Sequence, residues 1–307
     1  MQESFYKYMK VGIIHFMAYP NTIKGEGNIV ETITKIAEDD FFTAIEITWI
    51  KDPEVRKQAK AILDTSGMAV GYGAQPAVLI TPLNPNSLDE DERKAAVKAL
   101  MERLDEAHYM GAERMAFLSG KAPAAKDREA AIDALIKSTR ELCDYAMTKD
   151  MAIAIETFDE EIDKKALIGS SIASADFAST VNRSNFGLMV DLSHLPLLGE
   201  TPYECAEAVQ DHVVHLHVGN CVMANKDHPA YGDKHPRFGV EGGENDVEEL
   251  AEYLCAFMDV DFLNGEDQPF MSFEVSPMKD KDGNIIESSE VVIANAKRTL
   301  REAWAMI

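Results

Sequence analysis

The chain has 307 residues, a formal net charge of −23 and 46% apolar residues. This charge argues against a nucleic-acid or anionic-membrane partner, because phosphate contacts need basic side chains. No apolar run approaches the ~20 residues of a membrane span, and residues 1–10 lack the apolar core of a signal peptide. The four cysteines form no Cys-x-x-Cys pair, which is typical of free thiols, and we expect a cytoplasmic protein.

Strand-like and helix-like segments alternate through the first half of the chain. Four β-branched or apolar runs predict strands at 11–16, 44–50, 68–72 and 114–118. An apolar stripe predicts a helix over 29–37, and Asp52-Pro53-Glu54 is typical of a helix start. Residues 87–90 resemble a capping box ahead of a helix to about residue 110, and a further helix is predicted over 127–148. The segment 73–86 holds three prolines and is predicted to be a loop.

The second half repeats this alternation, but each of its strands ends in a chemically active residue. The apolar runs 152–155, 188–190, 213–216 and 270–273 end at Glu156, Asp191, His217 and Glu274. Helices are predicted at 171–181, 202–209, 245–258 and 287–304, and a long loop at 218–244. An unpaired carboxylate at the mouth of a buried strand is costly to desolvate, so a positive group is expected beside it.

Eight strand–helix units without a composition break predict a single (β/α)8 barrel domain over residues 1–307. An open doubly wound sheet is the alternative, but no Gly-x-Gly-x-x-Gly follows the first strand. In a barrel the active site lies at the carboxyl ends of the strands, so the four terminal residues would converge.

Three carboxylates and one imidazole suit Mn²⁺, Mg²⁺, Co²⁺ or Zn²⁺ as ligands. We expect one bound divalent ion and favour Mn²⁺ among these four. Any one of Glu156, Asp191, His217 and Glu274 is equally consistent with a structural ion pair. Their occurrence at four successive strand ends favours a metal site, because clustered carboxylates repel one another without a cation.

The order Glu, Asp-x-x-His, His, Glu, with the motifs VDLSH and HLHVGN, resembles the xylose-isomerase-like barrel superfamily of sugar isomerases and ketose 3-epimerases. The resemblance implies that Glu156, Asp191, His217 and Glu274 are metal ligands and that both glutamates also move protons as catalytic residues. It further implies that His194 contacts the substrate and takes part in catalysis. Arg237 resembles a substrate-binding arginine of that superfamily.

The long seventh loop departs from the epimerase pattern. Together with VGIIHFMAYP and YGAQP, it is similar to the large catalytic subunit of bacterial C-glycoside deglycosidases. That similarity implies a lyase acting on a 3-oxo sugar, a smaller partner subunit and possible homo-oligomers. His228 and His235 in this loop are candidates for holding an aglycone.

These resemblances share the first step of a mechanism. A divalent ion chelated by a carbonyl and its neighbouring hydroxyl stabilises an enediolate after a base removes the α-proton. Expulsion of a β substituent gives a lyase, which is our leading prediction, and reprotonation gives an isomerase or epimerase, which is the alternative. The negative net charge of the chain disfavours cleavage of abasic DNA. The presence of all four candidate metal ligands disfavours a protein that only binds a ligand without turnover.

Several candidates have a second interpretation. His15 ends the first strand and either lines the pocket as a substrate-binding residue or packs in the core. His194 alternatively caps the following turn, and Glu46 alternatively serves only as a buried ion-pair partner. His228, His235 and Arg237 alternatively stabilise their loop. Cys221 lacks the surroundings of a nucleophile.

Overall fold

A computed structural model describes residues 3–81 and 83–307. Its eight strands form one parallel sheet in the order β1-β8-β7-β6-β5-β4-β3-β2, curled into a nearly closed barrel. This confirms the predicted (β/α)8 fold. The strands are β1 Lys10–Ile13, β2 Ala44–Ile47, β3 Ala69–Gly73, β4 Arg114–Leu118, β5 Ala152–Glu156, β6 Phe186–Asp191, β7 Val213–Gly219 and β8 Phe270–Glu274.

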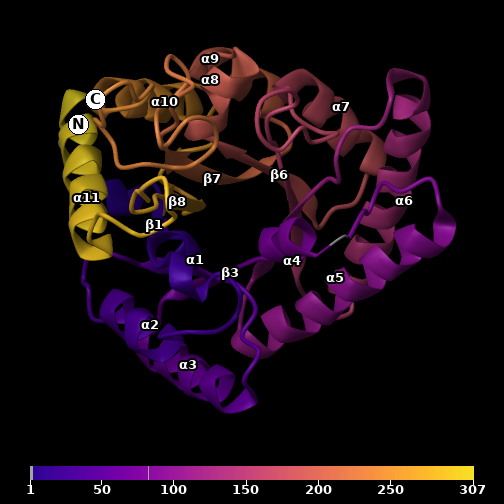
Figure 1. Ribbon diagram of the computed structural model, residues 1–307, viewed down its shortest axis with the longest axis horizontal. Helices are drawn as coiled ribbons and strands as arrows, with labels where there is room; N and C mark the ends of the chain where they lie inside the picture. The colour runs from indigo at the N-terminus through magenta and orange to yellow at the C-terminus, as the bar shows by residue number, and fades with distance from the viewer. Residues whose placement is uncertain (1–2, 82) are drawn as a thin grey trace.

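The helices surround the barrel in chain order, and both termini lie beside α11 (Figure 1). The α-helices are α1 His15–Ala18, α2 Ile29–Ala37, α3 Pro53–Ser66, α4 Gln75–Ile80, α5 Glu90–Met110, α6 Arg128–Met147, α7 Ser171–Val181, α8 Leu195–Leu198, α9 Pro202–Val209, α10 Val247–Asp259 and α11 Ser289–Met306. Four 3-10 turns accompany them: η1 Phe5–Lys7, η2 Pro20–Thr22, η3 Ala125–Asp127 and η4 Leu192–His194.

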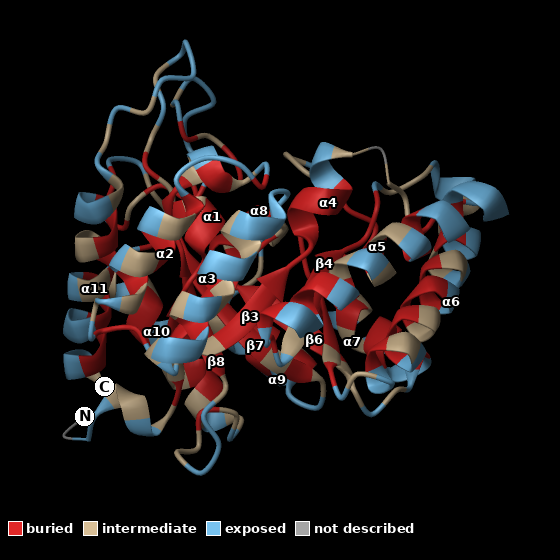
Figure 2. Cartoon of the chain, turned by 90° about the horizontal axis from the view of Figure 1, so that it is seen from below, coloured by how far each residue is buried: buried red, intermediate tan, exposed pale blue. Residues whose placement is uncertain are grey.

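The apolar core fills the layer between the strands and the ring of helices. Buried positions are concentrated on the strands and the inner helix faces, whereas exposed positions follow the outer faces and loops (Figure 2). The chain ends join this layer at the base of the barrel. There the Trp304 indole donates to the Glu3 carbonyl (2.7 Å) and packs edge-on against Phe5.

The barrel closes between β1 and β2 through few hydrogen bonds. The amide of Thr43 donates to the Val11 carbonyl (2.9 Å), the Val11 amide donates to Thr43 Oγ1 (2.9 Å), and one bridge joins Ile14 to Glu46. Inside the barrel, Gly71 makes room for Glu46, because a Cβ there would lie 2.9 Å from Glu46 Cγ. A buried carboxylate therefore occupies the axis below the strand ends.

The structure differs from the sequence prediction in several places. The second strand ends at Ile47 and not at residue 50, and the seventh continues beyond His217 to Gly219. The segment predicted as a loop over 73–86 contains α4, because Pro76 lies in its first turn, where a missing amide hydrogen is tolerated. The first strand ends at Ile13, and His15 begins a short helix. The cap of α5 is Asp89, which accepts from the amides of Asp91 and Glu92, so the capping box predicted at 87–90 is wrong.

Within the described residues, no helix is both long and apolar enough to cross a membrane. All four cysteines are free thiols, as expected, and three of them are buried.

Candidate metal centre

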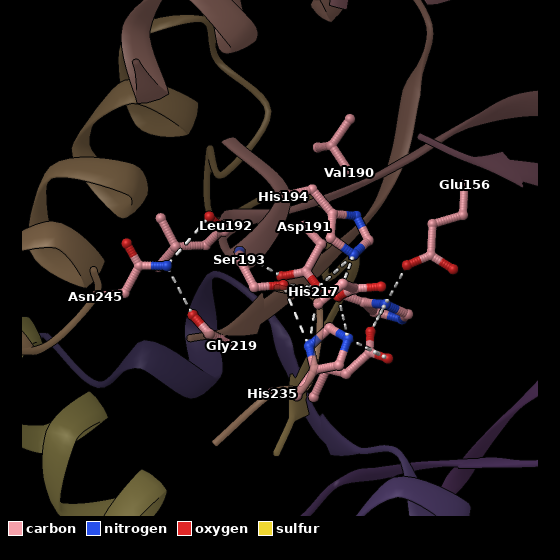
Figure 3. A network of polar contacts seen from close by, with 12 residues as sticks. Glu156, Val190, Asp191, Leu192, Ser193, His194, His217, Gly219, His235 and Asn245 are labelled. Carbon is pink, nitrogen blue, oxygen red and sulfur yellow. Dashed lines mark hydrogen bonds and ion pairs between the residues drawn. The ribbon is translucent and has the colours of Figure 1, made fainter. Parts of the chain in front are cut away.

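The barrel brings the four predicted ligands together at the carboxyl ends of β5 to β8. Glu156, Asp191, His217 and Glu274 are all buried, and one ligand atom from each lies within 4.8 Å of the others. They converge from four consecutive strands, and Figure 3 shows Glu156, Asp191 and His217 directed toward one another. The strand order explains this convergence, since residues in which parallel strands end share one rim of the barrel.

The imidazole of His217 is the centre of the cluster. Its Nδ1 lies 3.3 Å from Glu156 Oε1 and 2.9 Å from Glu274 Oε2. Its Nε2 faces the carboxylate of Glu46, at 3.1 and 3.2 Å from the two oxygens. Glu46 also lies 2.8 Å from Nε2 of His215. A carboxylate that accepts the Nε2 proton leaves the Nδ1 lone pair directed at the cluster, which is the usual support of a metal-binding histidine.

Hydrogen bonds fix the acidic side chains. Gln75, from α4, donates to Glu156 Oε2 (2.6 Å), and Ser193 donates to both oxygens of Asp191, from its amide (2.8 Å) and its hydroxyl (2.6 Å). Glu274 Oε2 is buried and faces only His217 Nδ1 at 2.9 Å, without a well-aligned hydrogen bond among the described residues. A buried carboxylate oxygen in this position is stabilised by a proton on His217 or by a cation.

The charges of the cluster agree with a cation-binding site. Burial disfavours a charged His217 ring, but Glu46, Glu156 and Glu274 outweigh burial and raise its pKa well above the usual value. Burial, with the neighbouring Glu156 charge, raises the pKa of Glu274. In the metal-free protein, protons thus take up charge that a divalent ion would neutralise, so metal binding releases protons.

These observations show that the residues fit a divalent metal ion. Three carboxylates and one neutral imidazole form a mainly oxygen donor set, which suits Mn²⁺ or Mg²⁺ and also accommodates Co²⁺ or Zn²⁺. Glu156, Asp191, His217 and Glu274 would hold the ion. The donor set does not select one metal among these.

A second layer of charged groups covers the cluster. Asp233, from the long loop after β7, lies 2.7 Å from His235 Nε2 and 3.1 Å from His194 Nε2 through its Oδ1. Its other oxygen lies 2.7 Å from Lys164 Nζ. His235 in turn lies 3.3 Å from Glu274 Oε1 and 3.7 Å from Asp191 Oδ2. One buried carboxylate therefore links three cationic groups to the candidate metal ligands.

His194 lies beside the candidate metal cluster, with its Nε2 3.7 Å from Asp191 Oδ2; its expected substrate contact stays a prediction. Its Nδ1 donates to the Thr157 carbonyl (2.7 Å), and its ring packs on Phe158 with the ring centroids 4.6 Å apart. Although burial disfavours a charged ring, Asp233 and Asp191 raise the pKa of His194 to about 10. His194 is therefore an imidazolium at neutral pH in the metal-free protein.

The backbone also adapts to this close packing. A Cβ on Gly219 would lie 2.5 Å from the Glu274 carbonyl oxygen and 3.2 Å from His235 Nδ1, so only glycine fits at the end of β7. Asn245 ties the same region together by donating to the carbonyls of Leu192 (3.2 Å) and Gly219 (3.0 Å), as Figure 3 shows.

Three predicted residues are not brought to the cluster. His15 bonds Thr32 of α2 (2.7 Å) and is buried beside Tyr19. Arg237 pairs with Glu287 (3.3 Å) and donates to nearby carbonyls of its own loop. His228 accepts from the Ala230 amide (3.0 Å). The substrate contacts proposed for His15 and Arg237 therefore have no support in their present positions.

Sequence reasoning missed Gln75, Lys164 and Asp233 as members of the site. Gln75 follows the end of β3, so its position at the strand rim was the available signal. Asp233 stands two residues before His235, and this Asp-x-His spacing in a long loop was a weaker one. No signal pointed to Lys164, whose partner lies in another loop.

A central pocket of about 180 Å³ opens at the cluster. Glu156, His217 and Glu274 form its polar base, whereas Phe16, Met17 and other apolar side chains form one side. Lys164, Asp233 and His235 also line it. The pocket therefore combines acid–base groups with an apolar wall, as expected for a small polar molecule that carries a carbon skeleton.

The chain matches the family model described as a xylose isomerase-like TIM barrel over residues 35–259. No curated protein matches it in sequence.

Several solved structures share the fold at low identity. D-psicose 3-epimerase from Clostridium cellulolyticum H10, solved with D-tagatose, has a TM-score of 0.70 and 17% identity, covering 97% of this chain and 99% of that one. D-allulose 3-epimerase from Methylomonas sp., in complex with D-allulose, has a TM-score of 0.70 and 16% identity, with 99% and 100% covered. 3-Keto-D-glucoside 4-epimerase from E. coli has a TM-score of 0.65 and 15% identity, covering 95% of this chain and 99% of that one.

Proposed function

Because the chain belongs to the xylose isomerase-like TIM-barrel family, we propose that it is a divalent-metal-dependent sugar epimerase or isomerase. The observation that carries this proposal is the pair Glu156 and Glu274. Both approach the same nitrogen of His217, yet they come from β5 and β8, which β6 and β7 separate in the sheet. Two carboxylates on different sides of one carbon can remove a proton and return one.

Each glutamate is prepared differently for proton transfer. Gln75 donates to Glu156 Oε2 (2.6 Å) and fixes the orientation of this carboxylate toward the pocket, as a base requires. Glu274 lines the central pocket on the far side of His217, where its carboxyl group can return a proton to the substrate. When bound, the metal ion would act as a Lewis acid toward a sugar carbonyl and its neighbouring hydroxyl. We therefore assign Glu156 and Glu274 as the catalytic pair and His194 as a positioning residue above Asp191.

The structural neighbours support this choice over the lyase that the sequence favoured. The psicose, allulose and keto-glucoside enzymes named above are epimerases that span the whole chain. All are below 20% identical, so they support a reaction class and no particular sugar.

A C-glycoside lyase is the second candidate, and the long loop favours it. That loop places His235 within 3.3 Å of Glu274, which adds a proton donor beside the pair. In such a reaction a glutamate removes the α-proton, the electron pair forms a carbon–carbon double bond, and the bond to the aglycone carbon breaks. His235 would then protonate that carbon. The partner subunit and homo-oligomer implied by the deglycosidase resemblance stay predictions.

The test starts from protein stripped with a chelator and refilled with Mn²⁺. It is incubated in D₂O with a panel of ketoses and keto-sugars, and with a 3-oxo-C-glucoside. Metal-dependent deuterium incorporation with a new epimer or isomer supports the proposal, whereas aglycone release selects the lyase.

The variants Glu156→Gln and Glu274→Gln should each lose roughly 10²- to 10⁴-fold in turnover, the usual contribution of an acid–base group. Glu106→Gln removes a buried carboxylate of α5 far from the cluster and serves as the control. Absence of stoichiometric metal, or full turnover by Glu156→Gln, would refute the shared mechanism.

A further inference from the structure

A second hollow, the α4 hollow, lies next to the central pocket and has a volume of about 350 Å³. Ser119, Gly120 and Lys121, which follow β4, line it, and Leu79 of α4 and Lys164 line both the α4 hollow and the central pocket. The central pocket, at about 180 Å³, is smaller than the roughly 300 to 1,000 Å³ of most ligand pockets. A molecule bound at the cluster is therefore expected to extend past these shared side chains into the α4 hollow.

Ser119 offers an unused hydrogen-bond donor to this hollow. It is 2% exposed, and its Oγ accepts from the amides of Leu167 (3.0 Å) and Ile168 (3.1 Å). A hydroxyl has two lone pairs and one proton, so these two amides occupy both lone pairs and the proton must point elsewhere. Within residues 3–81 and 83–307 this proton has no acceptor. An oxygen of a ligand in the α4 hollow would accept it.

Asn86 offers an unused acceptor beside the hollow. Its Oδ1 is buried and has no partner in the described part of the chain, whereas its Nδ2 donates to the Lys121 carbonyl (3.2 Å). Gly120 makes room for this amide, because a Cβ there would lie 2.7 Å from Asn86 Oδ1 and would overlap Asn84 Oδ1. A buried acceptor without a donor is costly, so a ligand that donates to it would be stabilised.

Lys164 supplies a third group at the junction of the two hollows. Its Nζ lies 2.7 Å from Asp233 Oδ2 and 3.5 Å from Asp163 Oδ2. An ammonium group has three N–H donors, so at least one remains after these two carboxylates are bonded. The carboxylates also balance the charge of Lys164, which therefore suits a neutral oxygen better than a further anion.

These groups are held in place before any ligand binds. The loops after β4 and β5 are joined, because the Ala122 amide donates to the Lys165 carbonyl (2.9 Å) and the Leu167 amide donates to the Gly120 carbonyl (3.0 Å). A preformed set of donors and acceptors reduces the ordering that a ligand would otherwise impose.

A sugar hydroxyl matches this set of groups. It can accept from Ser119 and donate to Asn86 Oδ1, whereas an ionised carboxylate can only accept, and an apolar ring would leave both groups unpaired. The apolar side chains of Val78, Leu79 and Leu118 line other parts of the hollow and can cover the C–H groups of a sugar.

We propose that the α4 hollow binds the distal hydroxyl groups of a sugar whose reacting carbons lie at the cluster, so that the substrate is a sugar whose chain extends beyond its fourth carbon. This inference rests on the proposed sugar-binding function of the central pocket. It adds the substrate class, and it assigns Lys164 and Ser119 as residues that determine specificity for chain length.

The test compares sugars of different length. Mn²⁺-loaded protein is incubated in D₂O with the six-carbon ketoses D-fructose, D-tagatose and D-allulose, and with the four-carbon D-erythrulose. NMR gives kcat/KM for metal-dependent deuterium incorporation next to the carbonyl. Lys164→Met should lower the ratio of six-carbon to four-carbon kcat/KM by about 10- to 100-fold, and Ser119→Ala by about 3- to 10-fold, as for the loss of a charged and of a neutral hydrogen bond. D-Erythrulose ends before the α4 hollow, so it reports any damage to the cluster or the loops, and such damage cancels in the ratio.

Lys234→Met is the matched control. Lys234 also joins the loops after β5 and β7, with its Nζ 2.6 Å from Asp163 Oδ2, but it lines neither hollow. Its variant should keep the ratio. A ratio that both Lys164→Met and Ser119→Ala retain, or that Lys234→Met lowers as much, would overturn the inference and leave the proposed function intact. Absence of exchange with all four ketoses would also overturn it; reaction of other keto-sugars would then still support the proposed function, whereas no reaction at all would remove both.

Discussion

Glu46 provides a sharp test of the metal site, because it touches no proposed ligand atom and yet positions one. Its oxygens lie 3.1 and 3.2 Å from Nε2 of His217 and 2.8 Å from Nε2 of His215. In Glu46→Gln a single amide oxygen remains to accept, and the amide nitrogen would face a ring N–H. His217 would then lose the partner that directs its Nδ1 toward Glu156 and Glu274.

Loss of such an orienting carboxylate typically lowers metal affinity by 10- to 100-fold, or about 1.4 to 2.7 kcal/mol. A second effect acts in the opposite direction. Glu46 helps to raise the pKa of His217, so in the variant His217 binds its proton less tightly and the proton competes less with the metal. This gain is greatest at pH 6.5, where proton competition is stronger. We therefore expect the loss of metal affinity to be larger at pH 8.5 than at pH 6.5.

The assay is calorimetric titration of chelator-stripped protein with Mn²⁺ at both pH values. Glu106→Gln is the matched control: Glu106 is also buried, but it accepts from the Ile50 amide (2.7 Å) at a distant site. Circular dichroism checks that both variants are folded. If Glu46→Gln bound Mn²⁺ as tightly as Glu106→Gln at both pH values, the assigned role of Glu46 would be wrong.

Three further outcomes are expected. Chelator treatment should lower the thermal midpoint, and Mn²⁺ should restore it. At a hundredfold excess of Mn²⁺ over Kd, binding adds up to about 2.7 kcal/mol to the free energy of unfolding. A midpoint that does not move in a thermal scan would contradict a metal site. Burial lowers the pKa of His15 to about 3 from 6.5, so its contribution to stability is complete above pH 6.5 and is lost as the pH falls toward 3. His15→Gln should therefore gain about 2 kcal/mol relative to the parent between pH 6.5 and 5 in urea unfolding, and parallel pH profiles would disprove this. Asp233→Asn leaves two buried imidazole rings, His194 and His235, and the partly buried Lys164 without their carboxylate, and should cost about 3 to 5 kcal/mol. Asp163→Asn, whose carboxylate is partly exposed, should cost about 0 to 1 kcal/mol, and equal urea midpoints would contradict the network.

The strand-end residues could be predicted from sequence because their signal is local. Each apolar run and its terminal acid or histidine are adjacent in the chain, and the barrel topology alone brings Glu156, Asp191, His217 and Glu274 together. The role of Glu46 could not be predicted in this way. Its pairing with His217 joins β2 and β7 across the inside of the barrel, over 171 residues, and depends on the space that Gly71 leaves.

The failure at α4 has a different cause. The three prolines predict a loop over 73–86, but a proline in the first turn of a helix breaks no hydrogen bond. A loop leaves the side chain of Gln75 without a defined position, whereas the first turn of α4 holds it as a donor to Glu156. Position within the turn, rather than the presence of proline, decides such cases.

The two loops that cover the site carry charges in an order that determines how they meet. Lys164 pairs with Asp233 (2.7 Å), and Lys234 pairs with Asp163 (2.6 Å), so two Asp-Lys dipeptides are joined crosswise. A shift of one residue in either loop would place Asp163 against Asp233, or Lys164 against Lys234. Such like-charge contacts are costly near a buried carboxylate, whereas the exposed pair alone is worth little. The Lys164–Asp233 pair thus contributes most of the stabilisation, and the Lys234–Asp163 pair fixes the register of the two loops. In this register His235 lies 3.3 Å from Glu274 Oε1.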